Sequence, residues 1–185
     1  MDKKNLKNLT GLKVLALIMI YLEHSGAISP LWGLSTRGTE FLFVCSGFLV
    51  SLKHSEDWKQ NTFNNSFLYL KEKLTVIYPV HFITFSYSVF LLFLQKRPIC
   101  STAIWSAFLN IFCLQAWSSN LYVVMDYNGL SWFISCLLFC YFLSPFYIQI
   151  ISRLKRKSIG LISVILFRAL LEYLLLSYPE QFFLL

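Results

Sequence analysis

Residues 11–26 read GLKVLALIMIYLEHSG and decide the class of fold. The stretch is nearly all apolar, yet it contains Lys13, Glu23 and His24. An apolar run of this length predicts a membrane-spanning helix. Ionisable side chains in such a run are expensive in lipid, so they indicate either a helix end at the head groups or a functional site.

The rest of the chain has the same character. Of its 185 residues, 57% are hydrophobic and only 14% are charged. Further apolar runs follow from end to end, so we predict an all-α fold, a polytopic transmembrane helix bundle in one membrane domain over residues 1–185. The runs predict five full spans at roughly 11–28, 38–52, 74–94, 130–151 and 159–176.

Residues 102–117 form a weaker apolar segment. It is short, contains Asn110 and Gln115, and is bracketed by two tryptophans, which suit a membrane interface. We therefore expect a re-entrant or interfacial helix here rather than a sixth crossing. This choice also returns the basic run RLKRK at 153–157 to the cytoplasm, as the positive-inside rule requires.

The net charge of +7 belongs to clusters between the predicted spans. Basic residues at such places set topology and contact anionic lipid head groups. We therefore expect a cytoplasmic N-terminus and the lipid bilayer as a partner. Nucleic acid is not expected, because no soluble basic domain is present to bind it. The five cysteines form no CxxC pair, and no metal site is predicted.

The spacing of Lys13 and His24 places both side chains on one helix face. Eleven residues at 100° each bring them within about 20° of one another, about 16 Å apart along the axis. Glu40, near the start of the next span, is predicted at the depth of His24. A carboxylate beside an imidazole forms an oriented general base. The alternative is that the Lys13 side chain extends to the membrane surface and that His24 lies among the outer head groups. Glu23 lies about 100° around the helix from His24, and we expect it to reach head groups as well.

The next stretch, GTEFLFVCSGFLV at residues 38–50, adds a motif. Ser46 and Gly47 alone fit close helix packing. After Lys13-x10-His24, however, the stretch resembles the acyltransferase-3 family of membrane acyltransferases, with its opening GLR…H and its G-V-[DE]-x-F-F-x-x-SGF-[LI] motif. The matching residues are Gly11, Leu12, Lys13, His24, Gly38, Glu40, Phe41, Phe43, Ser46, Gly47, Phe48 and Leu49.

Two later blocks extend the resemblance over residues 8 to about 150. KEKLTVIYP at 71–79 is similar to the family's basic stretch, and LSWFISCLLFCYFLSPF at 130–146 is similar to its tryptophan-containing span. Lysine replaces the family's first arginine at position 13, and Val76 stands where a second arginine is common. Members of the family usually have about ten spans. The spans predicted here are about half that number, so we expect the chain to have about half the usual length. The residues matching in these two blocks are Lys73, Tyr78, Pro79, Trp132, Tyr141 and Pro145.

The resemblance implies an enzyme that transfers an acyl group, typically acetyl, from acyl-CoA to a hydroxyl of a carbohydrate or another envelope molecule. His24 would accept the hydroxyl proton, and Glu40 would hold the ring. Ser46 would line the acyl path. The phosphates of the donor would be bound by Lys13, Lys71 and Lys73, whose alternative role is topology alone.

The expected partners follow from this chemistry. Acyl-CoA is a donor substrate, no cofactor is expected to stay bound, and the acceptor is an envelope glycan or a lipid-linked sugar. The resemblance implies that the protein lies in the inner (plasma) membrane of a bacterium. The sequence leaves open whether the protein forms a homo-oligomer.

Two other function classes also stay open. One is a truncated, non-catalytic remnant of the family. The other is a small proton- or anion-linked transporter using Lys13, Glu23, His24 and Glu40, although the two halves of the chain show no inverted repeat.

Overall fold

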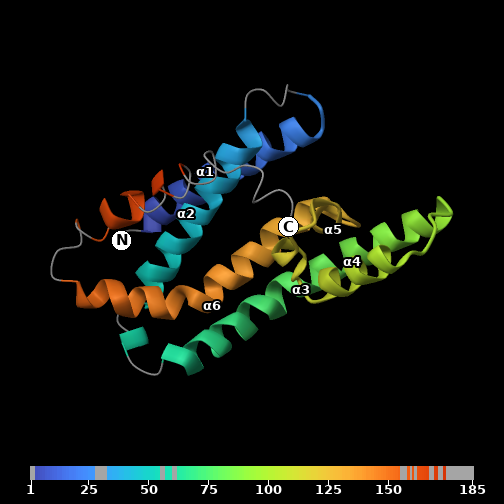
Figure 1. Cartoon of the computed structure of the whole chain (residues 1–185). Coiled ribbons are helices and arrows are strands. Elements are labelled where there is room, and N and C mark those ends of the chain that lie inside the picture. The colour runs from blue at the N-terminus through green and yellow to red at the C-terminus, as the bar shows by residue number, and fades with distance from the viewer. Residues whose placement is uncertain are drawn as a thin grey trace. The chain divides into compact units, whose positions relative to one another are not determined.

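The computed structural model describes residues 3–27, 33–54, 57–59 and 62–154, together with short pieces at 158, 160, 162–166, 169–170 and 173. In these residues all regular structure is helical and no strand occurs, which confirms the all-α class (Figure 1). The chain divides into two compact units, Met1–Asp57 and Trp58–Leu185. Each unit is described by itself.

The first unit is a helical hairpin. Helix α1 covers Lys3–His24 and α2 covers Leu34–His54. The two helices pack antiparallel, with buried Gly38 of α2 against Ala16 and Ile20 of α1. A Cβ on Gly38 would lie 2.8 Å from the carbonyl oxygen of Ala16, so this position requires a residue without a side chain.

In the second unit, α3 covers Thr62–Leu94 and α6 covers Trp132–Arg153. Helix α3 begins 12 residues before the predicted start at residue 74, so much of the segment 53–73 between two predicted spans is helical. The two helices run side by side and antiparallel (Figure 1), with ring contacts such as that between Phe67 and Phe142 at 5.4 Å. A short turn of 3₁₀ helix, η2 at Asp57–Lys59, precedes α3.

Short elements connect α3 to α6. They are α4 at Ser101–Ile111, η3 at Gln115–Trp117, α5 at Leu121–Met125 and η4 at Gly129–Ser131. Helix α4 has 11 residues, so it is about 16 Å long and too short to cross a hydrocarbon core of about 30 Å. This length agrees with the re-entrant or interfacial segment predicted at 102–117.

Two helical segments of the described chain are long and apolar enough to cross a membrane, Thr62–Leu94 and Gly129–Arg153. They correspond to the predicted spans 74–94 and 130–151. The other three predicted spans are not confirmed. Segments 11–28 and 38–52 are largely helical in α1 and α2, and half of the residues 159–176 lie outside the described residues.

Candidate active site

His24 is the last residue of α1, and its side chain is exposed. Its ring atom Nδ1 lies 2.9 Å from the backbone carbonyl oxygen of Ile20, one helical turn earlier. A carbonyl oxygen can only accept a hydrogen bond, so Nδ1 must carry the proton. The neutral ring then has its lone pair on Nε2, which is the atom that a general base would use.

Glu23, which is predicted to reach lipid head groups, makes a contact that the sequence does not reveal. Its Oε2 accepts a hydrogen bond from the backbone N–H of Ser35 at 3.0 Å, and its Oε1 accepts one from the Ser35 hydroxyl at 2.8 Å. Ser35 lies in the first turn of α2, where backbone N–H groups lack helical partners and a negative charge is favourable. Glu23 therefore joins the end of α1 to the start of α2.

Glu40 lies exposed on α2, five residues beyond Ser35. This spacing puts it about 7 Å further along the helix axis than the residue that meets Glu23. The hydrogen bond made by the His24 ring goes to Ile20 and not to Glu40. An orienting role of Glu40 thus stays a prediction, and the backbone carbonyl already supplies part of that role.

The remaining predicted residues lie at several places. In the first unit, the helical path from Lys13 to His24 is unbroken, so the predicted common face and the separation of about 16 Å hold. Lys13 and Ser46 are half-buried. In the second unit, Lys71 and Lys73 both lie on α3, where two residues correspond to about 200° around the axis. They therefore project from different faces.

Lys73 occupies an aromatic setting. Its Nζ lies 4.7 Å from the ring centre of Tyr69 and 5.9 Å from that of Tyr141, and it pairs with the Glu72 carboxylate at 3.2 Å. The two rings also contact each other edge-on at 5.5 Å. A cation over aromatic faces is attracted and held in position. The packing of α3 on α6 thus brings together Lys73 and Tyr141, which come from separate motifs.

A buried polar cluster escaped the sequence analysis. His81 Nε2 donates to the carbonyl oxygen of Asn110 at 2.7 Å, Gln115 donates to the Ser131 hydroxyl at 2.7 Å, and that hydroxyl lies 3.3 Å from Asn110 Oδ1. All four side chains are at most 2% exposed. Asn110 and Gln115 interrupt the apolar segment 102–117, but their spacing from His81 gives no local signal of a contact.

Arg97 is a second residue whose partner only the structure reveals. Its guanidinium bonds the Asp126 carboxylate and lies 6.0 Å from the ring centre of Tyr127. The hydrogen bond to Asp126 raises the pKa of Arg97, so the guanidinium stays charged. The cation is thereby compensated at the end of α3.

These features describe a helical chain with two candidate membrane spans, an exposed imidazole at His24 and an ammonium group at Lys73 held by two tyrosine rings. Comparison with known proteins adds the family: a family model described as an acyltransferase domain matches residues 6–185. The chain belongs to this acyltransferase-3 family, which is membrane-associated, and the resemblance predicted from its motifs is confirmed.

A curated relative supports the same family. The chain is 20% identical over 168 residues to Acyltransferase MdmB of Streptomyces mycarofaciens, an alignment that covers 83% of this chain and 42% of that protein. The chain thus spans less than half the length of this relative. No solved structure matches this chain.

Proposed function

We propose that this chain transfers an acyl group, acetyl in the simplest case, from acyl-CoA to a hydroxyl of a carbohydrate or another envelope molecule. Membership of the acyltransferase-3 family supports acyl transfer in general. The donor, the acceptor and the residue roles are the proposed part.

One observation carries the assignment of the base: the Nδ1–H of His24 is bonded to the Ile20 carbonyl while the side chain is exposed. This bond fixes the tautomer in which Nε2 can accept a proton. It also restrains the ring, because Nδ1 is tied to the helix that bears it. A positioned imidazole is suited to activate a hydroxyl as a general base.

The reaction then proceeds by direct attack. Nε2 takes the proton from the acceptor hydroxyl while its oxygen attacks the thioester carbonyl carbon of acyl-CoA. The carbon–sulfur bond breaks, the acyl group remains on the acceptor oxygen, and the coenzyme leaves as a thiolate that recovers the proton from the imidazolium. Glu40 is proposed to orient the ring in this step, and Ser46 to line the acyl path.

The donor phosphates require cations. Lys73 is the strongest candidate because its side chain is only 26% exposed and two tyrosine rings hold its ammonium group. Lys13 and Lys71 are proposed to add charge. We place these lysines on the cytoplasmic side of the inner membrane of a bacterium, with the N-terminus also cytoplasmic, because acyl-CoA is a cytoplasmic metabolite.

The test is transfer of label from acetyl-CoA to envelope glycans in membranes that contain the chain. His24→Asn keeps a side-chain donor near the Ile20 carbonyl but has no base, and we expect it to abolish transfer. Ser25→Ala is the matched control, because Ser25 is exposed beside His24 and bonds the Leu22 carbonyl in the same manner. Full transfer by His24→Asn would disprove the assignment of the base.

Glu40 is tested in the same assay. Glu40→Gln should lower kcat without raising KM for the donor if Glu40 orients the ring. If the wild-type chain transferred to no acceptor and moved a solute across vesicles instead, the transporter class would replace acyl transfer.

A further inference from the structure

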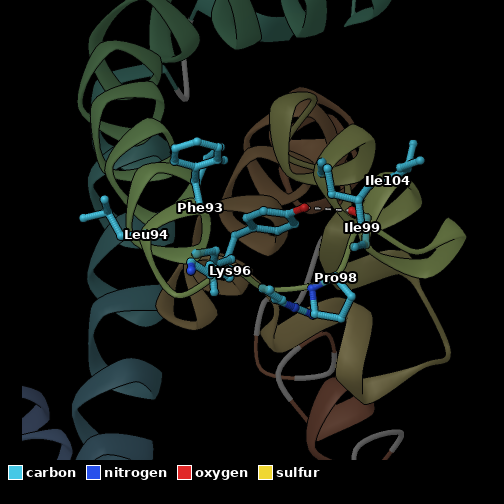
Figure 2. Close-up of a pocket in the computed structure, with 12 residues that line it drawn as sticks. Phe93, Leu94, Lys96, Pro98, Ile99 and Ile104 are labelled. Carbon is cyan, nitrogen blue, oxygen red and sulfur yellow. Dashed lines mark hydrogen bonds between the residues drawn. The ribbon is translucent and has the colours of Figure 1, made fainter.

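A large pocket lies at the end of α3, and none of the residues assigned above to transfer lines it. It has a volume of about 680 Å³, which is within the range of ligand-binding cavities. In Figure 2, Phe93 and Ile104 lie on opposite sides of it, and Lys96 and Pro98 lie along one edge. Its apolar walls are formed by Val89, Leu92, Phe93, Ile99, Ile104 and Ala107.

Polar residues also line the pocket. Tyr127 lines it and donates a hydrogen bond from its hydroxyl to the Ala103 carbonyl at 2.9 Å, the dashed line in Figure 2. Arg97 lies against the Tyr127 ring and is neutralised by Asp126. These contacts fix one side of the pocket without filling it.

Lys96 supplies the unbalanced charge of the pocket. No ion pair to its ammonium group occurs among the residues that the structure describes. Its backbone has φ 54°, in the left-handed region that ends α3, and its N–H bonds the Phe93 carbonyl at 3.0 Å. With Arg97 paired to Asp126, the pocket edge has a net charge of about +1 from Lys96.

We propose that this pocket binds one acyl chain of an anionic membrane phospholipid, with the phosphate of the lipid on Lys96. The apolar walls continue the lipid-facing surface of α3, whose end residues Phe93 and Leu94 are 77% and 58% exposed. An acyl chain can therefore enter from the bilayer without leaving lipid. The charge at the edge complements a monoanionic head group and not a zwitterionic one.

The test measures lipid retention and does not depend on acyl transfer. The full chain is purified in mild detergent with equal amounts of phosphatidylglycerol and phosphatidylcholine of identical acyl chains, and bound lipid is counted by native mass spectrometry. We expect one retained lipid with a preference for phosphatidylglycerol. Lys96→Asn removes the charge but tolerates the left-handed backbone, and it should lower this preference about fivefold.

Two further variants complete the design. Arg153→Gln removes an exposed cation of the basic run at the end of α6, outside the pocket, and should lower the preference less than Lys96→Asn does. Ala107→Trp fills the pocket and should reduce retention of both lipids. Equal retention of the two lipids by the wild type, or an unchanged preference in Lys96→Asn, would overturn the proposal. If Ala107→Trp does not fold, the Lys96 comparison still decides.

Discussion

Glu23 at the end of α1 accepts two hydrogen bonds from Ser35 at the start of α2, one from the backbone and one from the hydroxyl. The carboxylate thus lies where unpaired N–H groups and the positive end of the α2 dipole favour an anion. This contact closes the hairpin at the end where His24 lies, so the position of the proposed base depends on it.

Removing this carboxylate should loosen the hairpin. We expect Glu23→Ala to lower the midpoint of unfolding, because two hydrogen bonds at the start of α2 are lost. Denaturant unfolding in detergent micelles, followed by circular dichroism, measures the change. Ser35→Ala removes one of the two bonds and should cost less. If the two substitutions together cost the sum of the single ones, Glu23 and Ser35 are not coupled.

Gly38 offers a sharper steric test within the same hairpin. A Cβ there would lie 2.8 Å from both the Ala16 carbonyl oxygen and a side-chain carbon of Ile20. Gly38→Ala should therefore destabilise the hairpin by about 1–3 kcal/mol, as overpacking does. Gly47→Ala is the matched control, because nothing lies within 4 Å of its added Cβ. Equal melting temperatures for the two variants would contradict the close approach of α1 and α2.

His81 tests the buried polar cluster. The ring is 2% exposed and donates to the Asn110 carbonyl, which also accepts the Cys113 N–H at 3.1 Å. We expect His81→Leu to cost about 1–3 kcal/mol of stability, because a buried carbonyl loses a donor. His81→Gln, whose amide nitrogen can reach the place of Nε2, should recover part of the loss. Ser88→Ala, on the same helix but half-buried, should change the stability little.

Lys73 and Glu72 should act in opposite directions on donor binding. Lys73→Gln removes the cation proposed to bind phosphate, and we expect KM for acetyl-CoA to rise about tenfold, since a charge-assisted bond contributes about that factor. Glu72→Gln removes the carboxylate that occupies the ammonium group at 3.2 Å, so KM should fall. Steady-state kinetics on purified protein measures both. A fall in kcat alone in Lys73→Gln would exclude a binding role.

Tyr127 gives a pH dependence with a defined sign. Burial raises the pKa of its phenol, and the Asp126 carboxylate raises it further. Because the pKa in the folded chain lies above the ordinary value near 10, the stabilisation is complete below pH 10 and is lost as pH rises through the folded pKa. Melting temperatures from pH 7 to 11 should fall less steeply for Tyr127→Phe than for the wild type. Tyr122→Phe, at 87% exposure, is the control.

The sequence alone determined the all-α class, the apolar character of α3 and α6, and the family. These properties are carried by runs and motifs of adjacent residues, such as Ser46 within GTEFLFVCSGFLV, and such local patterns can be read without coordinates. That residues 102–117 contain only short helices was predictable for the same reason, because the polar interruptions are local, and the re-entrant or interfacial position of this segment stays a prediction. The start of α3 at Thr62 was not predicted, because residues 62–73 are rich in polar side chains and therefore resemble a link between two spans in composition.

Only the tertiary structure decided which side chains meet. The bonds of Glu23 to Ser35, of His81 to Asn110 and of Arg97 to Asp126 join residues 12 or 29 positions apart. The register between two helices sets such pairs, and that register depends on how whole faces pack, as at Gly38 and Ala16. The residues that share one face of a helix follow from about 100° of rotation per residue. The residues that face them on the adjacent helix do not, because no single residue encodes the packing of two helices.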